Sequence, residues 1–155
     1  MPSRDTRVDA ALLIVRAVVG LAFLLHGLDK LGDLSGVEQN FDGLGIPVPE
    51  LMAPFVALTE TVGGALLIAG LLTPLAGLAL GIDMIVAYAT VHTGKGFFAG
   101  DGGYELVLLL GASSFALMIA GAGRFSVDAA LKLPERVART RERRGGFPRP
   151  SSNAA

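Results

Sequence analysis

The sequence predicts an all-α protein, a transmembrane four-helix bundle with both termini in the cytoplasm. Hydrophobic residues make up 52% of the 155 residues and charged residues only 17%, whereas soluble domains carry about 25% charged residues. The apolar residues form four runs, each long enough to cross a hydrocarbon core about 30 Å thick. A soluble bundle would show a charged stripe on each helix, and these runs show none. The expected spans are residues 10–28, 51–72, 75–91 and 104–121.

The first two spans contain charged residues but keep the character of membrane helices. Span 10–28 holds Arg16 and ends near His26. No small residues follow it at the spacing of a cleavage site, so we interpret it as a retained helix and not as a signal peptide. Span 51–72 contains Glu60 near its middle and follows a proline-containing segment.

Helix-breaking residues separate the remaining spans. Thr73 and Pro74 lie between spans two and three. Thr73 is a candidate N-cap, and Pro74 fits the first helical position. Because this turn is short, we expect spans two and three to form an antiparallel hairpin. A glycine-rich segment, residues 100–103, precedes the fourth span.

Lys and Arg residues are concentrated on one side of the predicted membrane. Of the 13, ten lie before the first span or after the fourth, two lie in the loops on the other side, and Arg16 lies within a span. The positive-inside rule therefore places both termini in the cytoplasm. The long outer loop, residues 29–50, is acidic.

The chain outside the spans divides into three parts around the transmembrane domain, residues 10–125. Residues 1–9 form a cytoplasmic tail, and residues 126–142 are expected to form a basic juxtamembrane helix that begins with a cap at Ser126. Residues 143–155 have the composition of a disordered tail. The basic segment is expected to contact anionic lipid, the nearest polyanion, and not nucleic acid.

Three charged residues lie well inside the predicted spans, and Glu105 lies at the start of the fourth. Arg16, Glu60 and Asp83 each cost free energy in a bilayer unless they are paired, neutralised or near water, so each is expected to face the bundle. The short turn after span two would bring Glu60 and Asp83 near each other. Because Arg16 is the one intramembrane cation of the predicted spans, we expect it to pair with one of the carboxylates. Two roles stay open for this network, a purely structural one and a proton- or quinone-linked one.

A second polar group is expected at the outer face, where the span directions place residues from three helices at one depth. A quinone head group or a small anion needs hydrogen-bond donors and a cation, which these side chains supply. Two histidines are also able to ligate haem or a metal, and ordinary interfacial residues are the simplest alternative. With no cysteine in the chain, covalent haem attachment and Fe–S clusters are excluded, and we expect no metal. The candidate residues are His26, Lys30, His92, Tyr104 and Glu105.

Six motifs in order resemble the DoxX family of small bacterial membrane proteins over about residues 12–128. They are Arg16, His26–Lys30, Leu58–Gly64, His92–Phe98, Gly102–Glu105 and Gly123–Asp128. The resemblance implies a four-helix integral membrane fold in the bacterial cytoplasmic membrane. The family name comes from the small subunit of a thiosulfate:quinone oxidoreductase, and some members are associated with a membrane redox complex. Asp83 departs from the Asn or other polar residue expected at its position.

The resemblance therefore implies a membrane subunit or anchor of a quinone-linked oxidoreductase complex. Such a chain would bind a protein partner in the complex and would shape a quinone pocket, because it has no residues that carry electrons alone. A non-catalytic scaffold or stress-linked assembly factor is the alternative, followed by a small-molecule or proton-coupled carrier. Four short spans are few for a carrier unless the chain forms a homo-oligomer.

Overall fold

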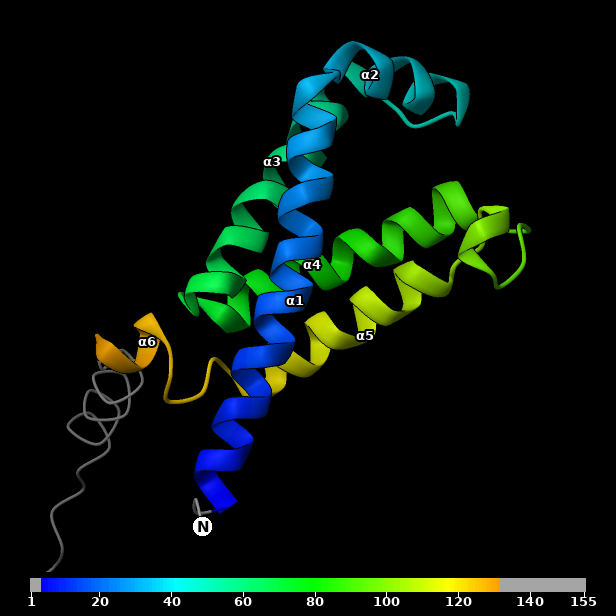
Figure 1. Cartoon of the computed structure of the whole chain (residues 1–155). Helices are drawn as coiled ribbons and strands as arrows, with labels where there is room; N and C mark the ends of the chain where they lie inside the picture. Colours follow the sequence, from blue (N-terminus) through cyan, green and yellow to red (C-terminus); the bar gives the residue numbers. More distant parts are fainter. Residues whose placement is uncertain (1–3, 132–155) are drawn as a thin grey trace, which may run out of the picture.

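The computed structural model describes residues 4–131, and in this part of the chain it contains helices and no strands (Figure 1). A π-helical turn, Tyr88–His92, extends the fourth α-helix, and a short 3₁₀ turn, Ala99–Asp101, lies in the loop that follows. The α-helices are α1 (Arg4–Gly32), α2 (Leu34–Gly43), α3 (Pro49–Ala69), α4 (Thr73–Ala87), α5 (Glu105–Ala120) and α6 (Val127–Ala130).

The four long helices are arranged as two pairs that diverge from each other. Helix α1 packs mainly on α3, and α4 packs mainly on α5. Figure 1 shows that the two pairs spread apart toward one end, and that α2 lies over that end. Helices α3 and α4 meet at the turn that joins them and stay close as far as Glu60 and Asp83, so the expected hairpin of spans two and three is present over that part. Beyond it the two helices diverge, because each packs more extensively on another helix (Figure 1).

Glycines allow the close approach within each pair. A Cβ atom added to Gly64 of α3 would lie 2.5 Å from the backbone nitrogen of Leu24 in α1. A Cβ atom added to Gly77 of α4 would lie 2.6 Å from the carbonyl oxygen of Ser114 in α5. Membrane helices associate through such small-residue contacts, because lipid offers no hydrophobic gain for helix pairing.

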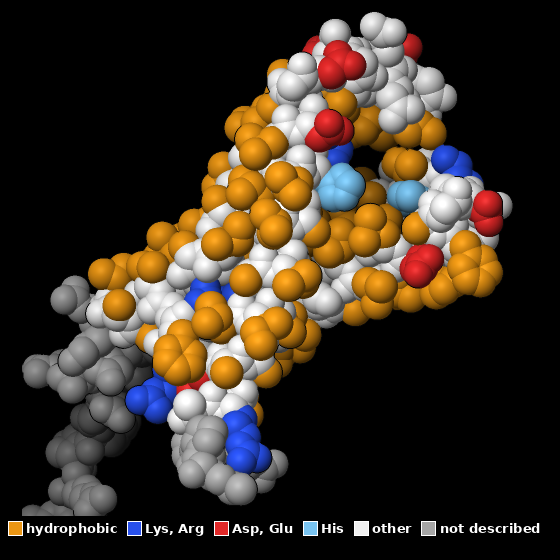
Figure 2. All heavy atoms as spheres, in the orientation of Figure 1, with side chains coloured by type: hydrophobic (Ala, Val, Ile, Leu, Met, Phe, Trp, Pro, Cys, Tyr) orange, Lys and Arg blue, Asp and Glu red, His pale blue; other side chains and the backbone are white. Residues whose placement is uncertain are grey.

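The distribution of apolar side chains fits a helix pair surrounded by lipid. Phe23 and Leu67 face the interior and are at most 1% exposed, whereas Ile14 and Val18 point outward and are each 64% exposed. Figure 2 shows that hydrophobic side chains cover much of the visible surface of the long helices. Within residues 4–131, three segments are long and apolar enough to cross a membrane. They are Asp5–Gly32, Pro49–Ala69 and Thr73–His92, while the apolar α5 is shorter, with 16 residues.

Two local expectations need correction. The acidic stretch 29–50 is not a plain loop, because Asp33 caps α2 by accepting a hydrogen bond from the Gly36 backbone nitrogen at 3.0 Å. Thr73 is not the N-cap of α4. Its hydroxyl is buried without a hydrogen-bond partner, and the carboxylate of Asp128 instead accepts from the backbone nitrogens of Leu72 and Thr73.

The segment after the fourth long helix is only partly described. Ser126 caps α6 by accepting a hydrogen bond from the Ala129 nitrogen at 3.2 Å, as expected of a helix that starts there. Helix α6 ends at Ala130. Most of the expected juxtamembrane helix, and the whole of the tail 143–155, lie outside the described residues.

Candidate functional site

A cavity of about 380 Å³ lies where the two helix pairs diverge, and we call it the cleft. All four long helices, α2 and the π-helical turn contribute to its lining. Figure 2 shows it as a hollow with one histidine on each side and Lys or Arg side chains at its edges. Its charged and imidazole side chains are His26, Lys30, Glu60, Asp83 and His92.

An ion pair joins α1 to α3 in the lining of the cleft. Lys30 Nζ donates a hydrogen bond to Glu60 Oε2 at 2.5 Å, and the Glu60 residue is only 4% exposed. The charge of this buried carboxylate is therefore balanced by Lys30, which the sequence had placed only at the outer face. A long side chain with a terminal ammonium reaches down from a helix end in this way.

Asp83 lies beside this ion pair. It is near enough for electrostatic interaction with both Glu60 and Lys30. The expectation that spans two and three bring Glu60 and Asp83 together is met in the structure. Asp83 Oδ2 is buried with no hydrogen-bond partner among the described residues. Both carboxyl groups line the cleft, so they are able to exchange protons with a ligand there.

His92 ends the π-helical turn, and its ring has a fixed orientation. Its Nδ1 lies 2.8 Å from the carbonyl oxygen of Gly102. A carbonyl oxygen only accepts, so Nδ1 carries the hydrogen, and Nε2 is the ring nitrogen left for a ligand. Single π-helical turns occur often at functional sites, and this one supplies part of the cleft lining.

Two of the five expected outer-face residues do not line the cleft. Glu105 accepts a hydrogen bond from the backbone nitrogen of Ala99 at 3.1 Å, so it holds the loop before α5. Tyr104 packs edge to face against the rings of Tyr88 and Phe97, with centroids 5.3 and 5.5 Å away. Both residues support the loop that borders the cleft, and Tyr104 lines a different cavity.

Within residues 4–131, Arg16 forms no ion pair with Glu60 or Asp83, and the expected pairing with one of them is wrong. Its guanidinium lies at the other end of the molecule from the cleft, where it donates hydrogen bonds to the carbonyl oxygens of Leu67, Ile68 and Phe125. The last carbonyls of a helix have no partner within that helix and carry a partial negative charge. Arg16, at 2% exposure, therefore closes the C-terminal end of α3 and ties it to the segment before α6.

Sequence reasoning missed the part of the cleft contributed by α2 and the first half of α3. The residues concerned are Asn40, Phe41, Ile46, Met52 and Val56. A signal was available, because Asp is a preferred N-cap residue and Asp33 precedes a segment that contains several apolar residues. Among these, Phe41 and Ile46 line the cleft.

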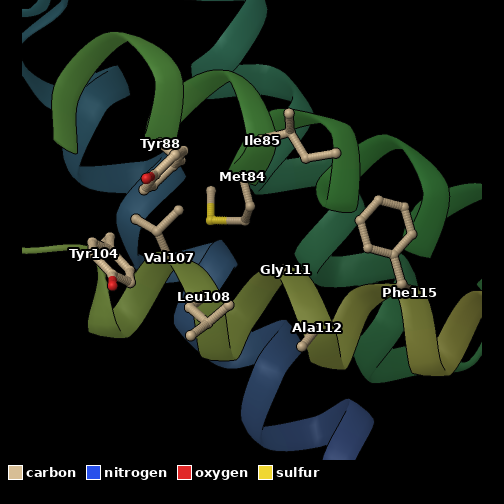
Figure 3. A pocket seen from close by; sticks show the side chains of 9 residues that line it. All are labelled: Met84, Ile85, Tyr88, Tyr104, Val107, Leu108, Gly111, Ala112 and Phe115. Atoms are coloured by element: carbon tan, nitrogen blue, oxygen red, sulfur yellow. The ribbon is translucent and has the colours of Figure 1, made fainter. Parts of the chain in front are cut away.

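A second cavity, of about 470 Å³, lies between α4 and α5, and we call it the groove (Figure 3). Its lining is apolar apart from two tyrosine hydroxyls, which lie toward one end in Figure 3. The residues that define it are Met84, Ile85, Tyr88, Tyr104, Val107, Leu108, Gly111, Ala112 and Phe115.

Comparison with known proteins identifies the family. The family model described as DoxX matches residues 11–93, which is more than half of the chain. The chain belongs to the DoxX family. No solved structure matches it.

The relatives are bacterial, and two of them are called membrane proteins. The chain is 33% identical to the Bacillus subtilis protein named "Putative oxidoreductase CatD" over 75% of this chain and 83% of that protein. It is 33% identical to the Mycobacterium tuberculosis "Uncharacterized membrane protein Rv3486", over 76% and 79%. It is 27% identical to the Escherichia coli "Inner membrane protein YqjF", over 77% and 91%. With its three long apolar helices, this DoxX protein is an integral membrane protein.

The chemistry available in the cleft of this DoxX protein is hydrogen bonding and proton exchange. Among residues 4–131, no three His, Asp or Glu side chains are grouped to hold a metal ion. The cleft instead combines a cation, two imidazoles and two carboxyl groups with apolar walls from Phe23, Phe41 and Leu110. Such a cavity suits an amphipathic ligand with a polar, hydrogen-bonding ring, because few polar groups then fix its orientation.

Proposed function

We propose that this DoxX protein is the membrane subunit or anchor of a quinone-linked oxidoreductase complex, and that the cleft binds the quinone ring. The observation that carries the proposal is the cleft itself, a cavity of about 380 Å³ among membrane helices that holds both donors and acceptors. Small-molecule sites have volumes of about 300–1,000 Å³. The Bacillus subtilis relative is named "Putative oxidoreductase CatD", and this name agrees with the proposed class of function.

The residues fit a quinone in both of its oxidation states. Quinone carbonyl oxygens need donors, which Lys30 supplies as an ammonium group near one wall. The hydroxyl groups of the reduced ring need acceptors, which Asp83 Oδ2 and His92 Nε2 supply. A bound quinone would exchange two electrons with a redox partner subunit, since this chain has no cysteine and no motif for an electron-carrying cofactor.

The proposal includes a topology with four spans and cytoplasmic termini in the bacterial cytoplasmic membrane. Helix α5 packs along α4 and has the same apolar character, which supports its crossing the membrane beside α4 despite its 16 residues. Arg7 lies in the first turns of α1, at the end of the molecule away from the cleft (Figure 1), and Arg124 lies beside Asp9 of the same helix, while Lys30 lines the cleft. The positive-inside rule then places the cleft in the outer half of the bilayer.

The test is competition for the cleft in lipid nanodiscs. A photoreactive azido-naphthoquinone, which carries the ring without a tail, is expected to label peptides from α1, α3 or α4 that line the cleft. Excess menadione should suppress this labelling, and Asp83→Asn and Lys30→Met should weaken it about tenfold. Asp29→Asn is the matched control, because Asp29 is an exposed carboxylate on α1 that does not line the cleft.

The outcomes separate the proposal from its alternative. Labelling that menadione does not suppress, or that the cleft variants do not change, would contradict quinone binding. A complex purified in mild detergent that holds a non-redox partner would favour the scaffold. A redox enzyme in that complex, together with specific labelling of the cleft, would support the proposal.

A further inference from the structure

The cleft and the groove share a wall. Met84 and Val107 line both cavities, and they are only 7% and 9% exposed. A single layer of side chains therefore separates the polar cavity from the apolar one. Figure 3 shows the Met84 and Val107 side chains between the ribbons of α4 and α5, with Tyr88 and Tyr104 at the same end of the groove.

The groove is shaped for a hydrocarbon chain. It has no charged residue in its lining, and Gly111 and Ala112 leave space on its α5 side between Leu108 and Phe115. A Cβ atom added to Gly111 would lie 3.1 Å from Met84 Cβ, so even one methyl group would press on the shared wall. Ile85 and Leu108 are 57% and 53% exposed, so the groove opens on the outer surface of the α4–α5 pair.

The shared wall is able to open at small cost. Methionine is unbranched and has several rotatable bonds, so it adapts to irregular spaces. Moving the Met84 side chain breaks no hydrogen bond, because its thioether has no partner to lose among the described residues. A ligand whose hydrocarbon tail passes Met84 would have its polar ring in the cleft and its tail against the apolar walls of the groove.

We propose that the groove binds the isoprenoid tail of the same quinone whose ring binds in the cleft, with Met84 as the flexible side chain between them. This inference rests on the proposed function. It assigns a second subsite and a preference for quinones with long tails. A tail in lipid gains no hydrophobic free energy by entering a protein groove, so the gain comes from contact with fixed, well-fitting walls. The expected preference is therefore modest.

The first experiment fills the groove. Menadione and a menaquinone with four isoprene units carry the same ring, and each is used in nanodiscs to compete with the azido-naphthoquinone probe. Ala112→Leu should raise the concentration of tailed menaquinone needed for half-maximal competition about three- to tenfold. It should leave the value for menadione unchanged. Ala116→Leu is the matched control, because Ala116 is also exposed on α5 but does not line the groove.

The second experiment uses the wild-type protein and does not depend on any variant. A menaquinone analogue with a diazirine at the end of its tail should label peptides of α4 and α5 that contain Ile85, Leu108 or Ala112. Labelling confined to the outer surface of α1 and α3 would overturn the tail site, and so would equal effects of Ala112→Leu on both competitors. If menadione itself fails to compete in wild type, the proposed function fails as well, and the two failures are thus distinguishable.

Discussion

Lys30 Nζ and Glu60 Oε2 lie 2.5 Å apart and connect α1 to α3 beside the cleft. The pair places a full positive and a full negative charge on membrane helices, where an unpaired charge costs several kcal/mol. The pair also determines the electrostatic environment of Asp83, because Asp83 interacts with both Lys30 and Glu60. The same contact therefore stabilises the first helix pair and determines the electrostatics of the candidate site.

Removing one partner of this ion pair is expected to be more harmful than removing both. Lys30→Met leaves the Glu60 carboxylate buried and unpaired, and should lower the free energy of unfolding by about 3 kcal/mol. Adding Glu60→Gln should restore part of that loss, because the unpaired charge is then gone. SDS titration in dodecyl maltoside micelles measures both. Lys95→Met, in an exposed loop, is the control. Strictly additive losses would contradict the coupling.

Arg16 is expected to act independently of the carboxylates. Arg16→Ala leaves carbonyl oxygens at the C-terminal end of α3 without a donor and should cost about 1–4 kcal/mol. Arg16→Lys should recover only part of this loss, since an ammonium lacks the planar fork that reaches three carbonyls. Combined with Glu60→Gln, the effects should add to within about 0.5 kcal/mol. A double mutant more stable than this sum would restore the pairing that the sequence suggested.

The sequence was sufficient to predict the four long helices, three of which are long and apolar enough to cross a membrane. The bilayer determines where hydrophobic runs and Lys and Arg residues occur along the chain, so membrane helices are recognisable from the sequence without knowledge of their packing. The partners of Arg16 could not be predicted in this way. They are backbone carbonyl groups at a helix end, which every residue has, whereas the sequence shows only side chains and so suggested a carboxylate. Lys30 was likewise assigned to the outer face, since its reach toward Glu60 depends on how α1 and α3 pack.

The candidate site was predicted in part for a similar reason. Residues at one depth are not necessarily in one cavity, because rotation about each helix axis decides which face they share. His26, Lys30 and His92 share the cleft. Tyr104 and Glu105 were expected at the same depth in the membrane, but they support a loop instead. Small residues are abundant in every span, so they could not indicate which helices pack most closely. They therefore did not predict that α3 packs more extensively on α1 than on α4.

Asp128, and not Thr73, is expected to cap α4. Asp128→Ala removes the acceptor for the backbone nitrogens of Leu72 and Thr73 and should lower stability by about 1–2 kcal/mol. Thr73→Val should change stability by less than about 0.5 kcal/mol, because the lost hydroxyl has no partner in the structure. Asp42→Ala, at an exposed position, is the control for loss of a carboxylate. A large loss for Thr73→Val with none for Asp128→Ala would reverse this assignment.

The topology is expected to place the end with α2 outside the cell. A cysteine at Gly43, which is exposed and where a side chain meets nothing within 4 Å, should react with an impermeant maleimide in intact cells. Cysteines at Ser3 and Ser152 should react only after the membrane is permeabilised, since the basic termini stay in the cytoplasm. The chain has no native cysteine, so no background labelling competes. Labelling of either terminus in intact cells would contradict the four-span topology.

The two nitrogens of His92 are expected to have separate roles. His92→Asn keeps an amide N–H near the position of Nδ1, where it is able to donate to the Gly102 carbonyl oxygen, but it removes the nitrogen at Nε2. His92→Gln reaches the position of Nε2 but gives up the short contact with the loop. If Nε2 binds the ligand, His92→Asn should weaken competition by menadione about tenfold.

The same pair of variants distinguishes a ligand role from a loop role. His92→Gln should retain more menadione binding than His92→Asn, while protease cleavage of the loop at residues 94–103 should increase in His92→Gln and not in His92→Asn. A purely structural histidine would reverse the order of menadione binding, because Asn alone preserves the contact with Gly102, and would leave the order of protease cleavage unchanged. Equal binding by both variants and wild type would remove His92 from the ligand site and leave Asp83 and Lys30 as its polar groups.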